Sequence, residues 1–332
     1  MSTAQPVLEI RDLSLEFPVF GGAVRALGGV GLRVMPGEIV GVVGESGSGK
    51  SVTAMAALRL LPPGGYRVTG GTLRLCGEDV LAAPEARMRQ WRGRRAAMIF
   101  QEPMTALNPT RRIGDQLTAV LRAHHRLDRR EALLRAGALL RDMMIPDPDR
   151  TLRAYPFELS GGMRQRAMIA LGLCCEPKLL IADEPTTALD VTTQAIILDL
   201  IKDLQDEMGM AVMFITHDLG VVAEIADDVV VMYLGRVAEH ADVETIFKSP
   251  RHPYTRALMR SIPRLGGSRE PLEAIRGMVP HPFRRPSGCN FHPRCPEVMA
   301  GRCEHTDPAL QTFEDGSQVR CLLYEAQPES AR

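Results

Sequence analysis

A glycine-rich stretch with one lysine and one serine at its end, GESGSGKS, occupies residues 44–51. Glycines let the backbone curl, so that successive N–H groups can point at phosphate oxygens. A lysine at this position reaches the β- and γ-phosphates of a nucleotide, and the next hydroxyl can take a Mg²⁺ position. The stretch therefore predicts a nucleoside triphosphate site. Its expected binding residues are Gly44, Ser46, Gly47, Gly49, Lys50, Ser51 and Val52.

Two adjacent carboxylates and a histidine could supply the rest of a phosphoryl-transfer site. Asp183 and Glu184 end the apolar run KLLIA, and His217 follows the apolar run MFIT. Asp183 would complete the magnesium shell directly or through water, and Glu184 would polarise the water that attacks the γ-phosphate. Carboxylates or a single histidine at strand ends are often only structural. A phosphate loop in the same chain favours the catalytic interpretation.

The elements that must position these residues alternate between strands and helices. Residues 5–43 and 69–100 have mainly strand patterns, whereas Ile113 to about Leu173 has helical spacing. The apolar runs LLIAD and AVMFIT flank a helical pattern from Thr192 to about Met208, which is typical of parallel strands covered on both faces. We therefore expect an α/β fold with a mostly parallel core sheet.

Composition narrows the class of protein. The 332 residues include 40 Lys+Arg and 40 Asp+Glu, so no overall charge indicates a nucleic acid or acidic lipid partner. The N-terminus lacks the basic and apolar regions of a signal peptide, and no apolar run approaches the ~18–20 residues that span a bilayer. We expect a soluble intracellular chain that reaches a membrane only through a partner.

A further motif, LSGGMRQR at residues 159–166, is not general to phosphate-loop proteins. With GESGSGKS, LLIADEP and ITHD it resembles the ATPase subunit of ABC transporters. The resemblance implies an N-terminal antiparallel β subdomain and a helical signature subdomain at about residues 108–175. It also implies that Ser160, Gly161 and Gly162 face the γ-phosphate bound by an opposite subunit.

The same resemblance assigns three more positions. Gln101 matches a residue that ligates Mg²⁺ and leads into the groove that grips the membrane subunit, so Glu184, His217 and Gln101 are the expected catalytic residues. Asp190, in TTALD, matches a residue at the dimer interface. Phe17 is the expected adenine-stacking aromatic residue, with Phe20 as its competitor.

The resemblance extends to one branch of the family. RHPYTRAL at residues 251–258 and the tail GCNFHPRCP are similar to dipeptide/oligopeptide importer ATPases, and Ser48 and Val52 are similar to the first of two paired ATPases. This implies a nucleotide-binding domain at 1–262 and a Cys-rich C-terminal module at 263–332. Expected partners are a second, non-identical ATPase, two membrane permeases and, indirectly, an extracytoplasmic binding protein. The site of action would be the cytoplasmic face of the membrane.

Two rival functions share this chemistry. An importer ATPase for another cargo, such as a nickel chelate, haem or glutathione, would carry the same ATP motifs. A soluble ABC ATPase outside transport is disfavoured, because such proteins usually have two phosphate loops or a long coiled-coil insertion. Neither feature is present in this sequence.

Seven cysteines fall into two groups. Cys76, Cys174 and Cys175 have apolar neighbours and are expected in the core. The tail set, Cys289, Cys295, Cys303 and Cys321, could bind a [4Fe–4S] cluster or tetrahedral Zn²⁺. The wide spacing and the known clusters of similar importer ATPases favour iron–sulfur; absence of metal is the third possibility. Ten arginines at residues 251–302 would lower the thiol pKa values.

Overall fold

The structure is a computed structural model that describes residues 5–187, 190–261, 275–281 and 283–325. Its core is an eight-stranded sheet in the order β11-β12-β10-β9-β3-β8-β7-β6. The strands β9, β3, β8, β7 and β6 pair in parallel, which confirms the mostly parallel core. Their bounds are β3 Ile39–Val43, β6 Ala96–Ile99, β7 Leu179–Asp183, β8 Ala211–Thr216 and β9 Asp228–Tyr233. Every residue of β3, β7 and β8 is buried, as continuous apolar runs predict.

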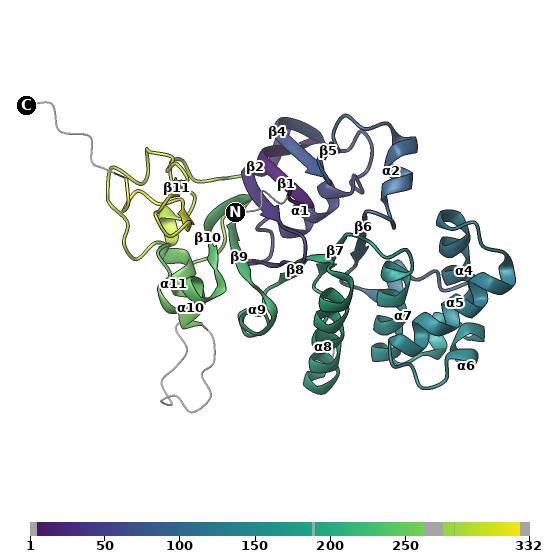
Figure 1. Ribbon diagram of the computed structural model, residues 1–332. Coiled ribbons are helices and arrows are strands. Elements are labelled where there is room, and N and C mark those ends of the chain that lie inside the picture. The colour runs from purple at the N-terminus through teal and green to yellow at the C-terminus, as the bar shows by residue number, and fades with distance from the viewer. Residues whose placement is uncertain (1–4, 188–189, 262–274, 282, 326–332) are drawn as a thin grey trace, which may run out of the picture.

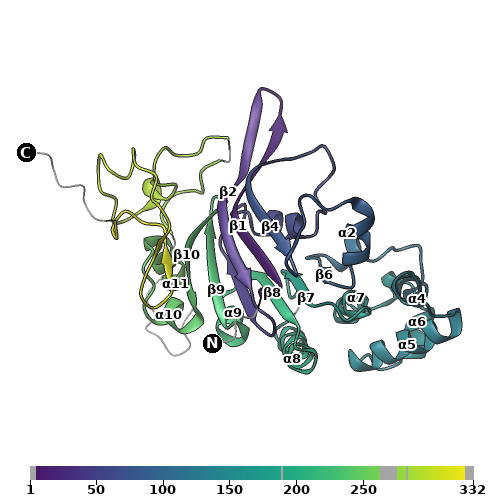
Figure 2. The same cartoon turned by 45° about the horizontal axis from the view of Figure 1, so that its top comes forward.

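A second, antiparallel sheet covers one side of the core and confirms the expected β subdomain (Figure 1). It has the order β2-β1-β4-β5, with β1 Leu8–Val19, β2 Gly22–Val34, β4 Arg67–Leu75 and β5 Glu78–Asp79. The β1–β2 hairpin projects beyond the rest of the molecule (Figure 2). The short helix α2, Glu85–Trp91, follows this sheet.

The helices divide between the core and a separate lobe. Helices α1 Lys50–Ala57, α8 Val191–Met208 and α9 Leu219–Ile225 follow core strands. The lobe, at the right of Figure 1, consists mainly of α4 Ile113–His124, α5 Arg129–Asp142, α6 Pro148–Arg153 and α7 Gly161–Leu173, with the short α3 Pro103–Ala106 before them. Asp128 and Glu131 form a capping box that starts α5. The expected helical subdomain is therefore present.

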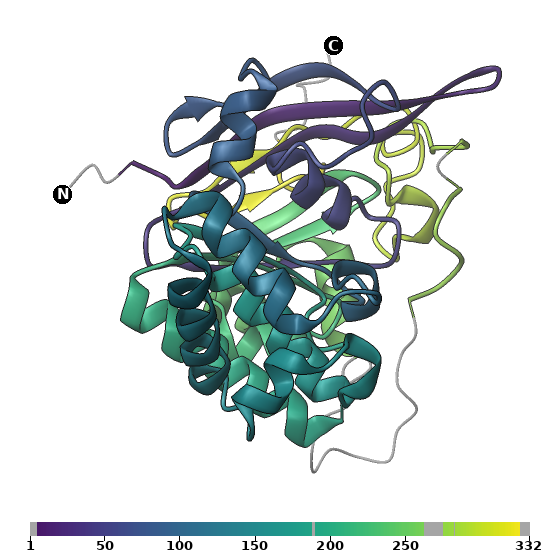
Figure 3. The same ribbon diagram turned by 90° about the vertical axis from the view of Figure 1, so that its right-hand side faces the viewer.

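The C-terminal part of the chain packs on the far edge of the core sheet (Figures 1 and 3). Strand β10, Arg236–Asp242, is followed by α10 Val243–Lys248 and α11 Pro253–Arg260. The short strands β11 Gln311–Thr312 and β12 Gln318–Val319 extend the core sheet, because β12 pairs with β10. The predicted domain boundary at 262/263 lies outside the described residues.

Three aromatic rings join the Cys-rich segment to the core. Tyr233 of β9 lies 4.7 Å from Tyr254 of α11 and 5.3 Å from Phe291, centroid to centroid. Tyr254 and Phe291 are also 5.3 Å apart. The segment thus shares a hydrophobic core with the sheet. Among the helices that the structure describes, none combines the length and apolar character needed to cross a bilayer.

Candidate nucleotide site

The phosphate loop connects β3 to α1 in a conformation that requires glycine. Gly44, Gly47 and Gly49 have φ angles of 150°, 77° and 101°, which side-chain-bearing residues rarely adopt. A Cβ atom on Gly44 would lie 2.2 Å from the carbonyl oxygen of Met232. The loop is therefore held against the end of β9. Residues 44–49 precede the N-terminus of α1, where backbone N–H groups favour an anion.

Lys50 points back into this loop. Its ammonium group donates hydrogen bonds to the carbonyl oxygens of Gly44 at 2.7 Å and Glu45 at 3.1 Å. Burial lowers the pKa of Lys50, and the charges of Glu184, Asp183 and Glu45 act in the opposite direction. A buried ammonium group held only by neutral carbonyls is well suited to exchange them for phosphate oxygens.

Ser51 and Asp183 lie side by side at the start of α1 and the end of β7. The Ser51 hydroxyl donates to Asp183 Oδ1 at 3.1 Å. Burial raises the pKa of Asp183, while the hydrogen bond from Ser51 lowers it. Hydroxyl and carboxylate oxygens are ligands that Mg²⁺ prefers, so this pair fits the predicted magnesium position.

Glu184 is the meeting point of three polar side chains. Its Oε2 atom accepts hydrogen bonds from Gln101 Nε2 at 3.0 Å and Thr187 Oγ1 at 3.0 Å, and lies 3.3 Å from His217 Nδ1. Its backbone has a φ of 48°, in the left-handed region. Such strain on a residue with a side chain is typical of functional sites. The structure therefore brings the three expected catalytic residues together.

Some of these groups line a cavity of about 360 Å³, which we call the nucleotide cavity; Gly44, Asp183 and His217 are not among its lining residues. The predicted residues that line it are Phe17, Ser46, Gly47, Gly49, Lys50, Ser51, Val52, Gln101 and Glu184. Phe17 and Phe20 differ sharply in position: Phe17 lines the cavity and packs partly on the core, whereas Phe20 is fully exposed at the hairpin turn.

The signature residues lie elsewhere. Ser160 caps the N-terminus of α7 by accepting a hydrogen bond from the Met163 N–H at 3.3 Å. Asp190 caps α8 in the same way through Thr193. A Cβ atom on Gly162 would lie 3.0 Å from the Thr193 side chain, so the two helix starts are adjacent. The predicted residues Ser160, Gly161, Gly162 and Asp190 are not among those that line the nucleotide cavity.

The four tail cysteines are free thiols, of which Cys289, Cys303 and Cys321 are buried. Burial, with a smaller contribution from neighbouring thiols, raises the pKa of Cys289, that of Cys295 to about 11 and that of Cys321 to about 12. The expectation that nearby arginines lower the thiol pKa values is therefore wrong for Cys289, Cys295 and Cys321. Within the described residues, no three or more His, Cys, Asp or Glu side chains form a group that could hold a metal ion. The predicted iron–sulfur or zinc site is thus not supported by the side-chain arrangement.

The other cysteines agree with the prediction. Cys174 and Cys175 are buried in the core, and Cys76 is half-buried against it.

Several residues of the nucleotide cavity were not predicted. Val24, Arg25 and Ala26 come from β2, Leu234 from the β9–β10 turn and Arg285 from the C-terminal segment. In the sequence, Val24, Arg25 and Ala26 are marked only by their closeness to Phe17, and Arg285 only by the arginine-rich composition around it. The ion pair between Glu45 of the phosphate loop and Arg294 was also missed.

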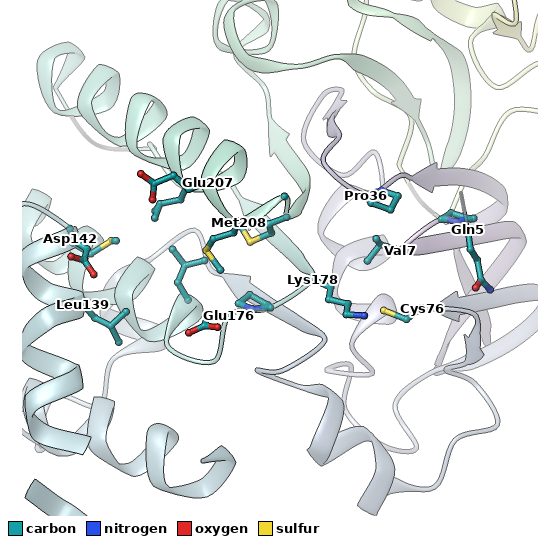
Figure 4. A pocket seen from close by; sticks show the side chains of 17 residues that line it. Gln5, Val7, Pro36, Cys76, Leu139, Asp142, Glu176, Lys178, Glu207 and Met208 are labelled. Atoms are coloured by element: carbon teal, nitrogen blue, oxygen red, sulfur yellow. The ribbon is translucent and has the colours of Figure 1, made fainter. Parts of the chain in front are cut away.

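A larger cavity of about 910 Å³ lies between the β subdomain, α5 and α8 (Figure 4). Its wall includes Val7, Pro36, Leu139 and Met208, with Lys178 and Cys76 on one side. None of the predicted site residues lines it. Size alone therefore does not locate the chemistry of this protein.

Comparison with known proteins gives a consistent result. Residues 27–187 match the family model described as ABC transporter, and residues 238–303 match that described as oligopeptide/dipeptide transporter, C-terminal region. The probable D,D-dipeptide transport ATP-binding protein DdpD of Escherichia coli (strain K12) is 54% identical, and the match covers 98% of each chain. The oligopeptide transport ATP-binding protein AppD of Bacillus subtilis (strain 168) is 46% identical over 96% of this chain and 97% of that one.

Solved structures share the fold. The dimeric structure of MJ0796, a bacterial ABC transporter cassette, is 26% identical with a TM-score of 0.64, covering 71% of this chain and 98% of that one. The structure of cbiO1 from Clostridium perfringens is 24% identical with a TM-score of 0.62, covering 74% and 91%. The latter likeness supports the fold alone.

Proposed function

This chain belongs to the ABC transporter family of ATP-binding proteins, and on that premise we propose that it hydrolyses ATP to power the import of dipeptides or oligopeptides. The observation that carries the ATPase part is that Lys50, Ser51 and Glu184 line one cavity and that Asp183 accepts a hydrogen bond from Ser51. The peptide part rests on relatives that are named as peptide-transport proteins and on the matching C-terminal region.

The residues divide the reaction among them. Lys50 exchanges its loop carbonyls for oxygens of the β- and γ-phosphates, and the N–H groups of the loop hold the same phosphates. Glu184 accepts a proton from the attacking water. His217 and Gln101 hold the Glu184 carboxylate in position. Ser51 and Asp183, with Gln101, would hold Mg²⁺, which neutralises charge on the phosphates when bound.

A second subunit completes the site. Ser160 and Gly161 are exposed and lie outside the cavity that contains Lys50, so they are free to act on ATP held by another chain. We infer that two ATPases close around two ATP molecules and exclude water from the reaction. Asp190, which caps the neighbouring α8, belongs to the same face.

The remaining partners follow from the transporter role. A non-identical second ATPase, two permease subunits and, indirectly, an extracytoplasmic binding protein would form the complex. This chain would lie on the cytoplasmic face of the membrane as a peripheral subunit. Residues 101–108, which begin at the Gln101 contact with Glu184, would transmit closure to the permeases.

An iron–sulfur cluster on the four tail cysteines is a separate part of the proposal, with zinc as the alternative. It is supported by the cysteine spacing and by the charges of Cys289, Cys295 and Cys303, which raise the pKa of Cys321. The arrangement of the side chains does not support it. Its role would be structural, at a distance from the reacting phosphates. Anaerobic purification with iron and zinc analysis decides it: a metal-free native protein would contradict it, and loss of iron in Cys289→Ser would support it.

The transport function can be tested with the assembled complex in sealed vesicles. ATP should drive uptake of a labelled dipeptide or short oligopeptide, and Lys50→Ala in this chain should reduce uptake to the background. Nickel chelates, haem and glutathione serve as competing cargoes. ATP hydrolysis that responds to one of these but not to peptides would overturn the peptide assignment while preserving the ATPase.

A further inference from the structure

Arg285 brings the C-terminal segment into the wall of the nucleotide cavity. Its Nη2 atom donates a hydrogen bond to the backbone oxygen of Arg25 at 2.7 Å. The same atom would lie only 2.9 Å from a Cβ on Gly235, a residue with a φ of 72°. Because Gly235 has no side chain, the Arg285 guanidinium fits between β2 and the β9–β10 turn.

Among the described residues, no carboxylate matches the charge of Arg285. Its two arginine neighbours are paired, Arg25 with Glu16 at 3.6 Å and Arg236 with Asp307. For Arg285 no ion pair occurs among the residues that the structure describes, and its buried Nε atom has no hydrogen-bond partner there. Burial, followed by the charges of Arg236 and Arg25, lowers its pKa to about 10, so the group remains charged at neutral pH.

Such an arrangement is unfavourable without an anion. A partly buried cation that lacks an anionic partner and lies beside like charges carries a desolvation and repulsion cost. A phosphate oxygen is an effective acceptor for a guanidinium group, and it would offset this cost. The nucleotide cavity is where a bound phosphate is expected.

The contacts of Arg285 also indicate which part of the nucleotide it meets. Arg25, whose carbonyl oxygen accepts this hydrogen bond, pairs with Glu16 in the β1–β2 ladder, directly next to the pair of Val24 with Phe17. Gln101 and Glu184, which mark the reaction side, bind one another instead. Arg285 therefore lies on the Phe17 side, where the base and ribose are expected.

We propose that Arg285 is a nucleotide-binding residue of the C-terminal segment, whose guanidinium contacts the ribose and α-phosphate of ATP. The inference rests on the proposed ATPase function. It makes the C-terminal segment a part of the ATP site. Because binding linkage is reciprocal, nucleotide binding then stabilises the placement of this segment on the core.

The test compares nucleotide affinities of the full-length chain by calorimetric titration. The probes are MgADP and the Mg²⁺ complex of the non-hydrolysable β,γ-imido analogue of ATP. Arg285→Ala should raise both dissociation constants by a similar factor, about tenfold or more. Arg285→Lys keeps the charge but loses the planar guanidinium group, so its dissociation constants should lie between those of Arg285→Ala and the wild type. Arg284→Ala is the matched control, because Arg284 is an exposed neighbour that does not line the cavity, and it should bind within twofold of wild type.

The outcomes separate the inference from the function on which it rests. Unchanged affinity in Arg285→Ala, with a wild type that binds both nucleotides, overturns the inference alone. Weakening for the ATP analogue without weakening for ADP overturns the assignment to the α-phosphate side. A wild-type chain that binds neither nucleotide overturns the proposed function itself. If Arg285→Ala does not fold, the Arg285→Lys titration decides by the same criteria.

Discussion

Arg294 of the C-terminal segment and Glu45 of the phosphate loop form a two-pronged ion pair, with Nη1–Oε2 at 2.6 Å and Nη2–Oε1 at 3.0 Å. The Arg294 side chain is only 4% exposed. Tyr254 strengthens the connection, because its hydroxyl accepts a hydrogen bond from the Glu45 N–H at 2.9 Å. The conformation of the phosphate loop therefore depends on residues 209 and 249 positions later in the chain.

Removing the charge of Glu45 should destabilise the protein. In Glu45→Gln the nearly buried Arg294 loses its carboxylate partner, and we expect the free energy of unfolding to fall by about 1–3 kcal/mol. Urea denaturation of the purified chain measures this change. Glu244→Gln is the control, because it breaks an exposed pair with Lys248 and should cost less than about 0.5 kcal/mol. Equal losses of unfolding free energy in the two variants would show that the Glu45–Arg294 pair stabilises the protein no more than an exposed ion pair does.

Replacing Glu184 by glutamine should separate ATP binding from hydrolysis. The amide keeps the size of the side chain and a partner for Gln101, but it cannot accept a proton from water. Turnover should fall by roughly 10²–10⁴-fold while the affinity for ATP stays within a few-fold of wild type. Phosphate release by transporter complexes that carry this chain gives the rate. Glu224→Gln on the surface of α9 is the control, and near-normal turnover in Glu184→Gln would remove Glu184 from the catalytic role.

The sequence was sufficient for elements whose signal is local. The loop 44–51 and the buried strands β7 and β8 each carry their pattern within a few residues, and the structure shows all of them. The fold class followed, because alternating buried strands and helices admit few arrangements.

Features that depend on distant contacts could not be predicted. Nothing near Arg285 or Arg294 in the sequence indicates that one lines the nucleotide cavity and the other binds the phosphate loop. The thiol pKa values were misjudged for the same reason. Counting nearby arginines ignores burial, which is the largest effect on Cys295 and Cys321.

The choice between Phe17 and Phe20 leads to a direct test. Phe17 lines the nucleotide cavity, whereas Phe20 is fully exposed at the tip of the hairpin. Phe17→Ala should weaken binding of ATP and ADP by about 5–20-fold through the loss of ring stacking and apolar contact. Phe20→Ala is the matched control and should bind as the wild type does. Fluorescence titration with both nucleotides provides the comparison, and a larger effect at Phe20 would reverse the assignment.

His252 predicts a specific acid sensitivity. This residue of the HPYT stretch is buried at the start of α11, where Nδ1 accepts a hydrogen bond from the Tyr254 N–H at 3.0 Å. Burial lowers its pKa from 6.5 to about 3. Between these values the unfolded chain binds a proton that the folded chain excludes. The stability that depends on neutral His252 is therefore fully present above about pH 6.5 and decreases as the pH falls toward 3.

The slope from this one group should reach at most about 1.4 kcal/mol per pH unit, and it should disappear in His252→Asn. Asparagine preserves the capping of α11, since it is also a good N-cap residue, so the variant isolates the titration from the loss of a cap. His305→Asn is the control, because His305 is exposed in the same segment. Urea denaturation at pH 7.5, 6.0 and 5.0 gives the slopes. If wild type and His252→Asn lose stability in parallel between pH 6.0 and 5.0, the acid sensitivity originates in other groups and His252 is not its source.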